Sequence, residues 1–323
     1  MHQFIRGFIL AAVGFLLMQA AIAQNTWPNK PIRIIVPFAA GSFTETAART
    51  LGAELSQQWG QPVIVETKGG AGSTLGTDMV AKSAPDGYTL LVTDNSFAVS
   101  AALYDKLPYD PEKDIIKIST VAESPAVLMV KADTPYKSLK DLVDQAHKSP
   151  KQLTYGSGGQ GSSAHLATEL FFIQTNSELT HVPYRGVAAA LLDLMAGRID
   201  VGLSSAGSAA QHIKGGKLRG LAVVGKERHP LIPEVPTFTE AGFGSYDMVY
   251  WFGLMAPAGL PPAVLARIQQ GVARAVEQPK VIEVFAAAGA RALARSSADF
   301  SKKVQDESRV WKNVVIKSAI KIE

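Results

Sequence analysis

The chain contains no cysteine. It therefore has no disulfide, no thiolate ligand for a metal ion and no cysteine to which a lipid anchor could be attached. Lysines and arginines are scattered, without a basic run and without aromatic residues between basic ones. The sequence pI of about 9.1 therefore indicates a solvated surface, and we expect no nucleic-acid partner.

Long apolar runs are also missing, apart from one near the start of the chain. Arg6 precedes an apolar run over residues 8–18, and Ala21-Ile22-Ala23 then matches a small-residue cleavage pattern. The run is shorter than the about 20 residues that a membrane-spanning helix needs. We expect residues 1–23 to be a secretory signal peptide that is cleaved after Ala23, so that the mature protein is exported.

From residue 31 onward, short apolar runs alternate with helical patterns. Strands are expected at residues 32–38, 62–66 and 88–93, and a helix after the first strand shows one apolar stripe of Ala47, Leu51, Leu55 and Trp59. The same alternation begins again further along the chain. Strands are expected at 153–155, 181–184, 199–203 and 218–224, and helices at 138–147, at 187–196, after the 153–155 strand as far as 174, and after the 199–203 strand as far as 213. This alternation predicts an α/β fold with parallel sheets.

The order of these segments predicts two units. Residues 115–121 and 126–130 are strand-like and are separated by 122–125, and a second unit begins near Ala126. Residues 248–255 form a strand that returns to the first unit, and helices at 261–277, 280–288 and 298–317 are expected to pack on that unit. We therefore expect two doubly wound lobes joined by a hinge: residues 24–125 with 248–323 form the first lobe, and residues 126–247 form the second. Such a topology places a ligand cleft between the lobes.

A glycine-rich stretch, LTYGSGGQGSSAHLA at residues 153–167, joins a strand to a helix. The unpaired N–H groups of a first helical turn favour an anion at such a junction. Gly156, Gly158 and Gly161 spell GxGxxG, but the next strand does not end in the acidic residue that a dinucleotide site requires. We therefore expect a smaller anion, and no cofactor.

Metal and catalytic sites leave little trace in the sequence. No two histidines lie within one or two turns of a helix, so no metal site is expected. The segment 202–206 approaches a nucleophile elbow but lacks the closing glycine, and His165, His181, His212 and His229 are scattered. We expect no enzyme. An exported serine-dependent hydrolase that acts on a small ester, with Ser162 as the residue to test, remains the alternative.

Several loops at the carboxyl ends of the expected strands are rich in glycine, serine and threonine and nearly free of charge. Neutral donors at helix N-termini suit a carboxylate, because no buried ion pair has to be desolvated. Ser42 and Glu45 have the spacing of a capping box, which gives Glu45 a structural role. The candidate loops are 41–44, 70–74, 95–96, 158–163 and 204–205.

From about residue 27 to its end, the chain resembles a known family, the tripartite tricarboxylate transporter solute-binding receptors, also called Bug or TctC-like proteins. The resemblance rests on motifs in the same order along the chain, with the residue numbers in parentheses: WPxKPIR (27–33), VPFAAG (36–41), GAG with a later glycine (70–72, 76), PDGYTL (85–90), YGS (155–157), GS with HLA (161–162, 165–167), HVPYRG (181–186), DLxxG (193–197), VPTFxEAG (235–242), WxG (251–253) and APAG (256–259).

The resemblance implies a periplasmic Venus-flytrap receptor that binds a small carboxylate and delivers it to transporter membrane subunits. We expect a monomer. By position, the resemblance assigns the first lobe's contact to Gly41, Ser42, Phe43 and Thr44. It assigns the second lobe's contact to Gly161, Ser162 and Ser163, with further lining from Asn95, His165, Ser204 and Ser205.

One loop departs from the family pattern. Where the family usually has two glycines and a nearby aspartate, this chain has Ser42, Phe43 and Glu45. A phenylalanine beside a carboxylate-binding loop can pack against an aromatic ring. This departure leads to the hypothesis that the ligand is an aromatic carboxylate.

Overall fold

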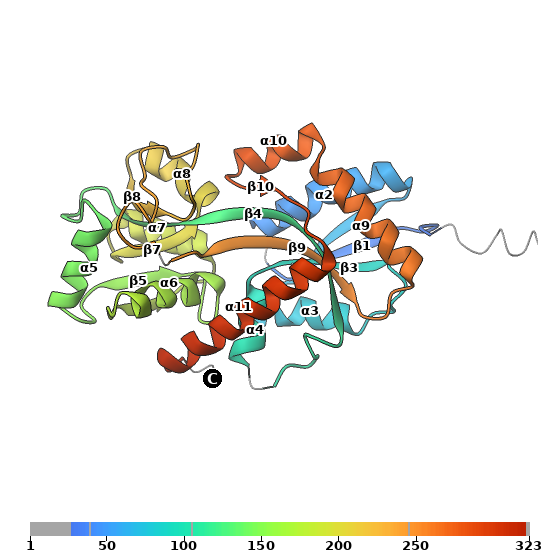
Figure 1. The fold of residues 1–323 in the computed structure, drawn as a ribbon, viewed down its shortest axis with the longest axis horizontal. Coiled ribbons are helices and arrows are strands. Elements are labelled where there is room, and N and C mark those ends of the chain that lie inside the picture. Colours follow the sequence, from blue (N-terminus) through green and yellow to red (C-terminus); the bar gives the residue numbers. More distant parts are fainter. Residues whose placement is uncertain (1–26, 39, 105, 245, 321–323) are drawn as a thin grey trace, which may run out of the picture.

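A computed structural model describes residues 27–320 except 39, 105 and 245. The expected signal peptide at residues 1–23 lies outside the described residues. Figure 1 shows two lobes side by side, with two long strands running between them. In the described part of the chain, no helix is both long and apolar enough to cross a membrane.

The first lobe is built on a mixed sheet. Its parallel strands are β1 (Ile32–Val36), β2 (Val63–Thr67) and β3 (Thr89–Asp94), in the order β2-β1-β3. β9 (Val249–Pro257) runs antiparallel to β3, which confirms that the chain returns to the first lobe there. β4 (Ile115–Lys131) is antiparallel to β9, and the short β10 (Arg291–Ala292) pairs with the middle of β4.

The second lobe repeats this plan with its own three parallel strands. They are β5 (Thr154–Ser157), β6 (Thr180–Pro183) and β7 (Val201–Ser205), in the order β6-β5-β7. The far part of β4 lies antiparallel to both β7 and β8 (Leu218–Val223). Each lobe is therefore a mixed sheet rather than a purely parallel one, because β4, β8 and β9 run against their neighbours.

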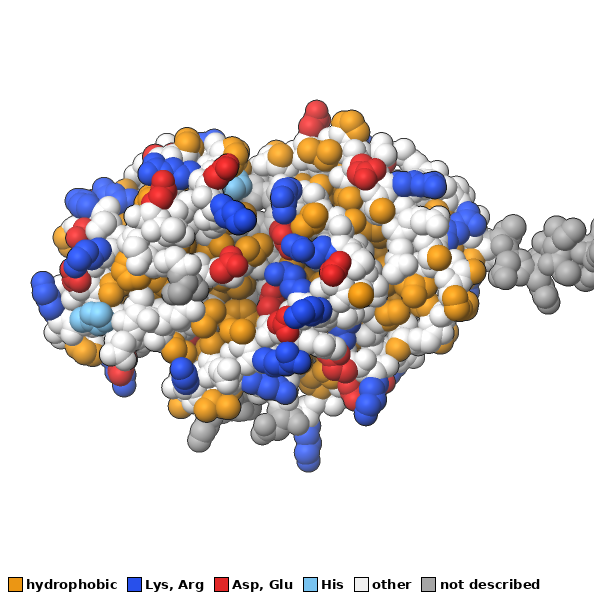
Figure 2. All heavy atoms as spheres, viewed as in Figure 1, with side chains coloured by type: hydrophobic (Ala, Val, Ile, Leu, Met, Phe, Trp, Pro, Cys, Tyr) orange, Lys and Arg blue, Asp and Glu red, His pale blue; other side chains and the backbone are white. Residues whose placement is uncertain are grey.

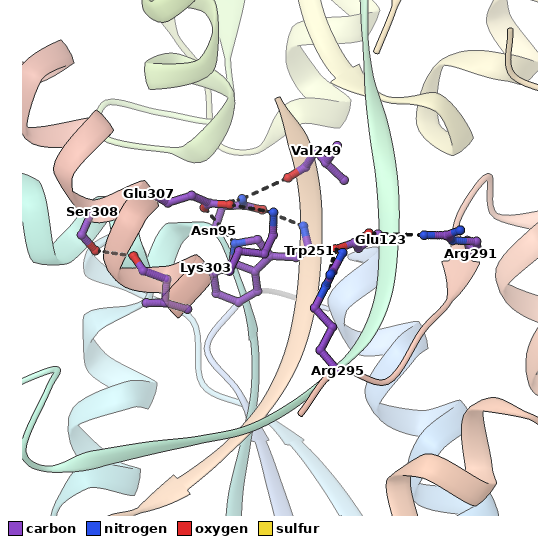
Figure 3. Close-up of polar contacts among 10 residues, drawn as sticks. Asn95, Glu123, Val249, Trp251, Arg291, Arg295, Lys303, Glu307 and Ser308 are labelled. Atoms are coloured by element: carbon purple, nitrogen blue, oxygen red, sulfur yellow. Dashed lines mark hydrogen bonds and ion pairs between the residues drawn. The ribbon is translucent and has the colours of Figure 1, made fainter. Parts of the chain in front are cut away.

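β4 differs from the sequence expectation because it is one continuous strand. Residues 122–125 look like a turn, but all except Pro125 lie deep in the structure and each pairs with a residue of β9. The charge of Glu123 is balanced by Arg295 at 2.8 Å and by Arg291 at 3.7 Å (Figure 3). The pairing partner changes from β9 at Pro125 to β7 at Ala126, so a single strand enters both lobes.

Helices cover the sheets of both lobes. The first lobe has α2 (Phe43–Trp59), the short helical turn η1 (Ala71–Ser73), α3 (Thr74–Ala81), α4 (Ser96–Leu103), α9 (Pro262–Val276), α10 (Pro279–Ala287) and α11 (Ser297–Lys317). The second has α5 (Leu139–Lys148), α6 (Ser163–Gln174), α7 (Val187–Ala196) and α8 (Ala206–Lys214). The expected stripe of α2 is confirmed, since Ala47, Leu51, Leu55 and Trp59 are all buried.

α11 was expected to pack on the first lobe, and it also reaches the second. It lies along α4, and its C-terminal end contacts α6, as Figure 1 shows where the helix passes below the two long strands. Just beyond its end, Ser318 Oγ donates a hydrogen bond of 2.6 Å to Glu169 Oε2 of α6. α11 is therefore a third connection between the lobes, beside β4 and the segment that leads into β9.

The two lobes share one large hydrophobic core. It extends from β1, β3 and β9 through β4 to α5 and α6, while a smaller core lies between β4, α7 and α8 of the second lobe. On the face in Figure 2, basic side chains gather along the junction of the lobes and are interspersed with acidic ones. Their mixture gives no continuous basic surface on that face.

Candidate functional site

The loop at residues 41–44 leads from β1 into α2, and its polar groups hold one another. Ser42 caps the helix, accepting the Glu45 N–H at 3.2 Å. Glu45 accepts the Gly41 N–H at 2.7 Å and pairs with Arg49. These two partners, the Gly41 N–H first, lower the pKa of the Glu45 carboxyl. The structural role expected for Glu45 is confirmed. The N–H groups of Phe43 and Thr44 lie in the first turn of α2, where the helix has no preceding turn to supply carbonyl partners.

Phe43 packs against other aromatic rings of the protein. Its ring centroid lies 4.6 Å from that of Phe252 and 5.7 Å from that of Phe285, both in edge-to-face arrangements. The side chain is half-buried at the margin of the large core. Its expected contact with an aromatic ligand remains a hypothesis.

Thr44 joins this loop to the end of β3. Its side chain is almost fully buried, and its Oγ1 donates to Asp94 Oδ2 at 3.4 Å. Asp94 Oδ1 accepts the Ser96 N–H at 2.9 Å at the start of α4. The loops after β1 and β3 therefore lie together, as expected for the carboxyl ends of neighbouring parallel strands.

The side chain of Asn95 is hydrogen-bonded toward β9 and α11. Its side chain is fully buried, and its Nδ2 donates to Val249 O at 3.2 Å and to Glu307 Oε2 at 2.9 Å. Its Oδ1 accepts the Trp251 N–H at 2.9 Å (Figure 3). With every amide group bonded toward β9 and α11, the side chain of Asn95 connects parts of the first lobe and offers no free group to a ligand.

The glycine-rich loop of the second lobe ends in a capped helix. Ser162 is the N-cap of α6 and accepts the His165 N–H at 3.3 Å. Gly161 has a φ of +73°, which favours glycine, and its N–H donates to His165 Nδ1 at 3.1 Å. Ser163 is the first residue of α6 and is 9 % exposed. The loop geometry therefore depends on the ring of His165 as well as on its glycines.

His181 is a residue of this site that sequence reasoning did not identify. Its ring stacks on that of His165 with centroids 3.8 Å apart, and on Tyr155 at 4.9 Å. Its Nε2 lies 2.7 Å from Ser157 Oγ, which also bonds to Gly159. The available signal was register, because His181 on β6 pairs with Tyr155 on β5, directly before the loop.

Both imidazole rings are neutral at pH 7. Burial, and to a smaller extent the charge of His181, lowers the pKa of His165 to about 3. Burial lowers the pKa of His181 to about 4. A ring that accepts the Gly161 N–H through Nδ1 has to carry its proton on Nε2. The glycine-rich loop is thus packed against two stacked, uncharged imidazole rings.

This stack predicts an acid-sensitive fold. A histidine whose pKa is depressed contributes its full stability above its unfolded pKa of about 6.5. That contribution is lost progressively as the pH falls from there to the folded pKa. We expect the free energy of unfolding, measured with urea between pH 7 and 4.5, to fall less steeply in His181→Phe than in the wild type. Parallel pH profiles for the two proteins would contradict this expectation. Both proteins contain the same carboxylates, so the effect of carboxylate titration cancels in the comparison.

Ser204 and Ser205 are the last residues of β7 rather than part of a loop. Ser204 is 2 % exposed, and its Oγ donates to Ser205 O at 3.4 Å. Ser205 caps α8 by accepting the Ser208 N–H at 3.4 Å. α8 therefore begins at a serine cap after a strand, as α2, α5, α6 and α11 also do.

The arrangement offers little to a catalyst. Among the described residues, the serine hydroxyl that contacts a histidine ring is that of Ser157, which is 1 % exposed and also bonded to its own loop. Ser162, the residue of the hydrolase alternative, accepts a hydrogen bond from the His165 N–H through its hydroxyl oxygen. Within the same described part of the chain, no group of histidines and carboxylates could hold a metal ion.

The lobes touch where α8 faces the end of α10. A Cβ placed on Gly207, in the first turn of α8, would lie 1.7 Å from the backbone oxygen of Ala288, and one on Gly289 would lie 2.3 Å from Gly207 N. Between the loops 41–44 and 161–163 themselves, no hydrogen bond joins described residues. The backbones of the two lobes are therefore in direct contact here, next to residues 124–126 of β4.

Two surface hollows lie away from these loops. One of about 390 Å³ lies between α2 and α9 beside Trp59, Arg267 and Arg274. The other, of about 440 Å³, lies in the second lobe beside His147 and Phe243. Neither is lined by a candidate residue.

Comparison with known proteins gives the same architecture. Residues 47–320 match the model of the tripartite tricarboxylate transporter family receptor. The chain belongs to this receptor family. It is 34 % identical to Protein BugT of Bordetella pertussis over 98 % of both chains.

Solved structures of this receptor family share the fold. One, described as a periplasmic transporter, is 35 % identical, covers 92 % of this chain and all of its own, and has a TM-score of 0.83. MatC from Rhodopseudomonas palustris, solved with bound malate, is 32 % identical with a TM-score of 0.81, covering 90 % of this chain and all of MatC. A second R. palustris protein, solved with adipate, is 31 % identical with a TM-score of 0.83, covering 91 % of this chain and 99 % of its own. The expected two-lobe α/β receptor fold is confirmed, and the family consists of receptors rather than enzymes.

Proposed function

We propose that this chain is a periplasmic receptor that binds a small carboxylate between the loops 41–44 and 161–163 and delivers it to the membrane subunits of a tripartite tricarboxylate transporter. One observation carries the proposal: α2 of the first lobe and α6 of the second each follow a strand and begin at a serine cap. Such helix ends present N–H groups and a positive dipole to an anion. The malate and adipate of the two similar structures are carboxylates.

The lobe boundaries belong to the same proposal. We assign residues 24–125 and 248–323 to the first lobe and 126–247 to the second. The change of partner along β4 at residues 125–126 supports this division, as does the hydrogen bond from the Ala126 N–H to Met248 O. We further propose that the mature receptor begins after Ala23 and acts as a monomer.

A thermal-shift screen over small mono- and dicarboxylates tests the function. A ligand at about 100 times its Kd stabilises the folded state by about 2.7 kcal/mol. For a chain of this size, that corresponds to a rise in melting temperature of about 4 °C. We expect at least one carboxylate to give this rise and to be recovered unchanged. Turnover of an ester that stops in Ser162→Ala would favour the hydrolase alternative instead.

The same screen addresses the nature of the ligand body. If the ligand is an aromatic carboxylate that packs on Phe43, Phe43→Ala should weaken the binding of aromatic acids more than the binding of aliphatic acids. Because the ring of Phe43 already packs on Phe252 and Phe285, it has less surface left for a ligand than a free ring would have. An unchanged affinity for aromatic acids in Phe43→Ala would reject the aromatic hypothesis and leave the carboxylate receptor intact.

A further inference from the structure

A polar cluster at the end of β3 is not explained by the family motifs. Asp94 is paired with Phe252 across the antiparallel β3–β9 contact, so their side chains lie on one face of the sheet. Tyr250 is two residues from Phe252 on β9 and shares that face, which is also where Phe43 packs. Asp94 and Tyr250 therefore lie beside the loop 41–44, whereas Asn95 and Trp251 lie on the opposite face with α11.

Asp94 carries a carboxyl group without a cation. Among the described residues its hydrogen-bond partners are the Ser96 N–H at 2.9 Å, the Ser96 side chain and Thr44 Oγ1 at 3.4 Å, and it takes part in no ion pair. Burial raises the pKa of this carboxyl against the effect of those hydrogen bonds. All of these partners are neutral donors, so no cation offsets the charge of the ionised carboxyl.

Tyr250 adds a second unsatisfied group. Its side chain is 7 % exposed, and its buried hydroxyl has no hydrogen-bond partner. Burial raises the pKa of Tyr250, and the charge of Asp94 raises it further. A buried hydroxyl without a partner costs free energy, so a native structure that retains one calls for an explanation.

In its ionised form, Asp94 would repel a bare carboxylate ligand bound to the loop 41–44. A ligand with a hydrogen-bond donor next to its carboxylate would instead bind both the loop and Asp94. We propose that Asp94 and Tyr250 recognise a hydroxyl or ammonium group on the carbon next to the ligand carboxylate, so that the substrate class is a 2-hydroxy or 2-amino carboxylate. This inference rests on the proposed function, since it assumes that a carboxylate occupies the loop 41–44.

Calorimetry with matched ligands tests the inference. Succinate, malate and aspartate differ only in the group on C2, and phenylacetate with mandelate forms the corresponding aromatic pair. We expect a member with a hydroxyl or ammonium group to bind at least about tenfold more tightly than its unsubstituted partner, as for hydrogen bonds to charged groups. Preference for aspartate over malate would identify the donor as an ammonium group, and the reverse would identify a hydroxyl group.

Two variants assign the preference to these side chains. In Asp94→Asn we expect affinity for the substituted acid to fall about tenfold while affinity for succinate or phenylacetate stays or rises, because the repulsion is removed. Tyr250→Phe removes only the unpartnered hydroxyl, so we expect this variant to fold like the wild type. We expect its affinity ratio between the substituted and the unsubstituted acid to be several-fold smaller than that of the wild type. Asp306→Asn, a change on the exposed surface of α11, serves as the control.

The outcomes separate the two proposals. Equal affinities within each matched pair, or an equal loss for all ligands in Asp94→Asn, would overturn the inference about Asp94 and Tyr250. If the wild type binds none of the carboxylates, the proposed function itself fails.

Discussion

A methyl group on Gly207 is expected to weaken carboxylate binding at least about tenfold. The added Cβ of Gly207→Ala would lie 1.7 Å from the backbone oxygen of Ala288, and backbone cannot move aside as a flexible side chain can. The lobes have to separate at this contact, so the lobe arrangement of this structure, which we take to be the binding-competent one, becomes less populated. Apparent affinity falls in proportion to the binding-competent fraction, and a tenfold fall corresponds to about 1.4 kcal/mol.

The same substitution is not expected to destabilise the ligand-free protein. Alanine is favoured over glycine within a helix by about 1 kcal/mol, and the clash is relieved when the lobes open. Calorimetry of binding and urea unfolding without ligand together distinguish lobe separation from a damaged fold. Gln211→Ala, an exposed change in the same helix, is the control. Wild-type affinity in Gly207→Ala would contradict the closed contact between α8 and α10.

Replacing Glu307 by leucine is expected to lower the free energy of unfolding by about 3–5 kcal/mol, since it removes one member of a buried polar network. Glu307 of α11 accepts hydrogen bonds from Asn95 Nδ2 at 2.9 Å and Trp251 Nε1 at 2.8 Å, and Lys303 lies 3.3 Å away. Figure 3 shows these side chains converging between β9 and α11. Without the carboxylate, two buried donors and a largely buried lysine lose their acceptor.

Two further variants test this interpretation by urea unfolding. Glu307→Gln keeps an oxygen acceptor, so we expect a clearly smaller loss than in Glu307→Leu. Asp306→Asn changes the neighbouring exposed residue, whose surface ion pairs are worth about 1 kcal/mol or less. Equal stabilities of Glu307→Leu and Asp306→Asn would mean that the network does not hold α11 to the first lobe.

Much of the fold could be predicted because its signals are local. Helices such as α7 have strong apolar patterns and end at a glycine, here Gly197 in the left-handed conformation. β4 could not be predicted as one strand, since residues 122–125 resemble a turn and become strand only through pairing with β9 and through the ion pair of Glu123 with Arg295. Those partners are more than 120 residues away along the chain, so no local pattern reveals them.

The candidate site divides in the same way. The serine caps of α2 and α6 are local motifs, and the sequence locates Ser42 and Ser162 directly. Asn95 and Asp94 are neighbours in the chain, yet they lie on opposite faces of a sheet whose partner β9 is remote in sequence. The support of the loop by His181 is equally hidden, because it depends on the pairing of β5 with β6.

A crystal structure with the carboxylate that gives the largest thermal shift tests the receptor proposal most directly. We expect one ligand carboxylate within hydrogen-bond distance of the loop 41–44 and the rest of the ligand against the loop 161–163, with Gly207 still in contact with Ala288. A ligand found instead in the hollow beside Trp59 and Arg267, with the two loops empty, would contradict the proposal.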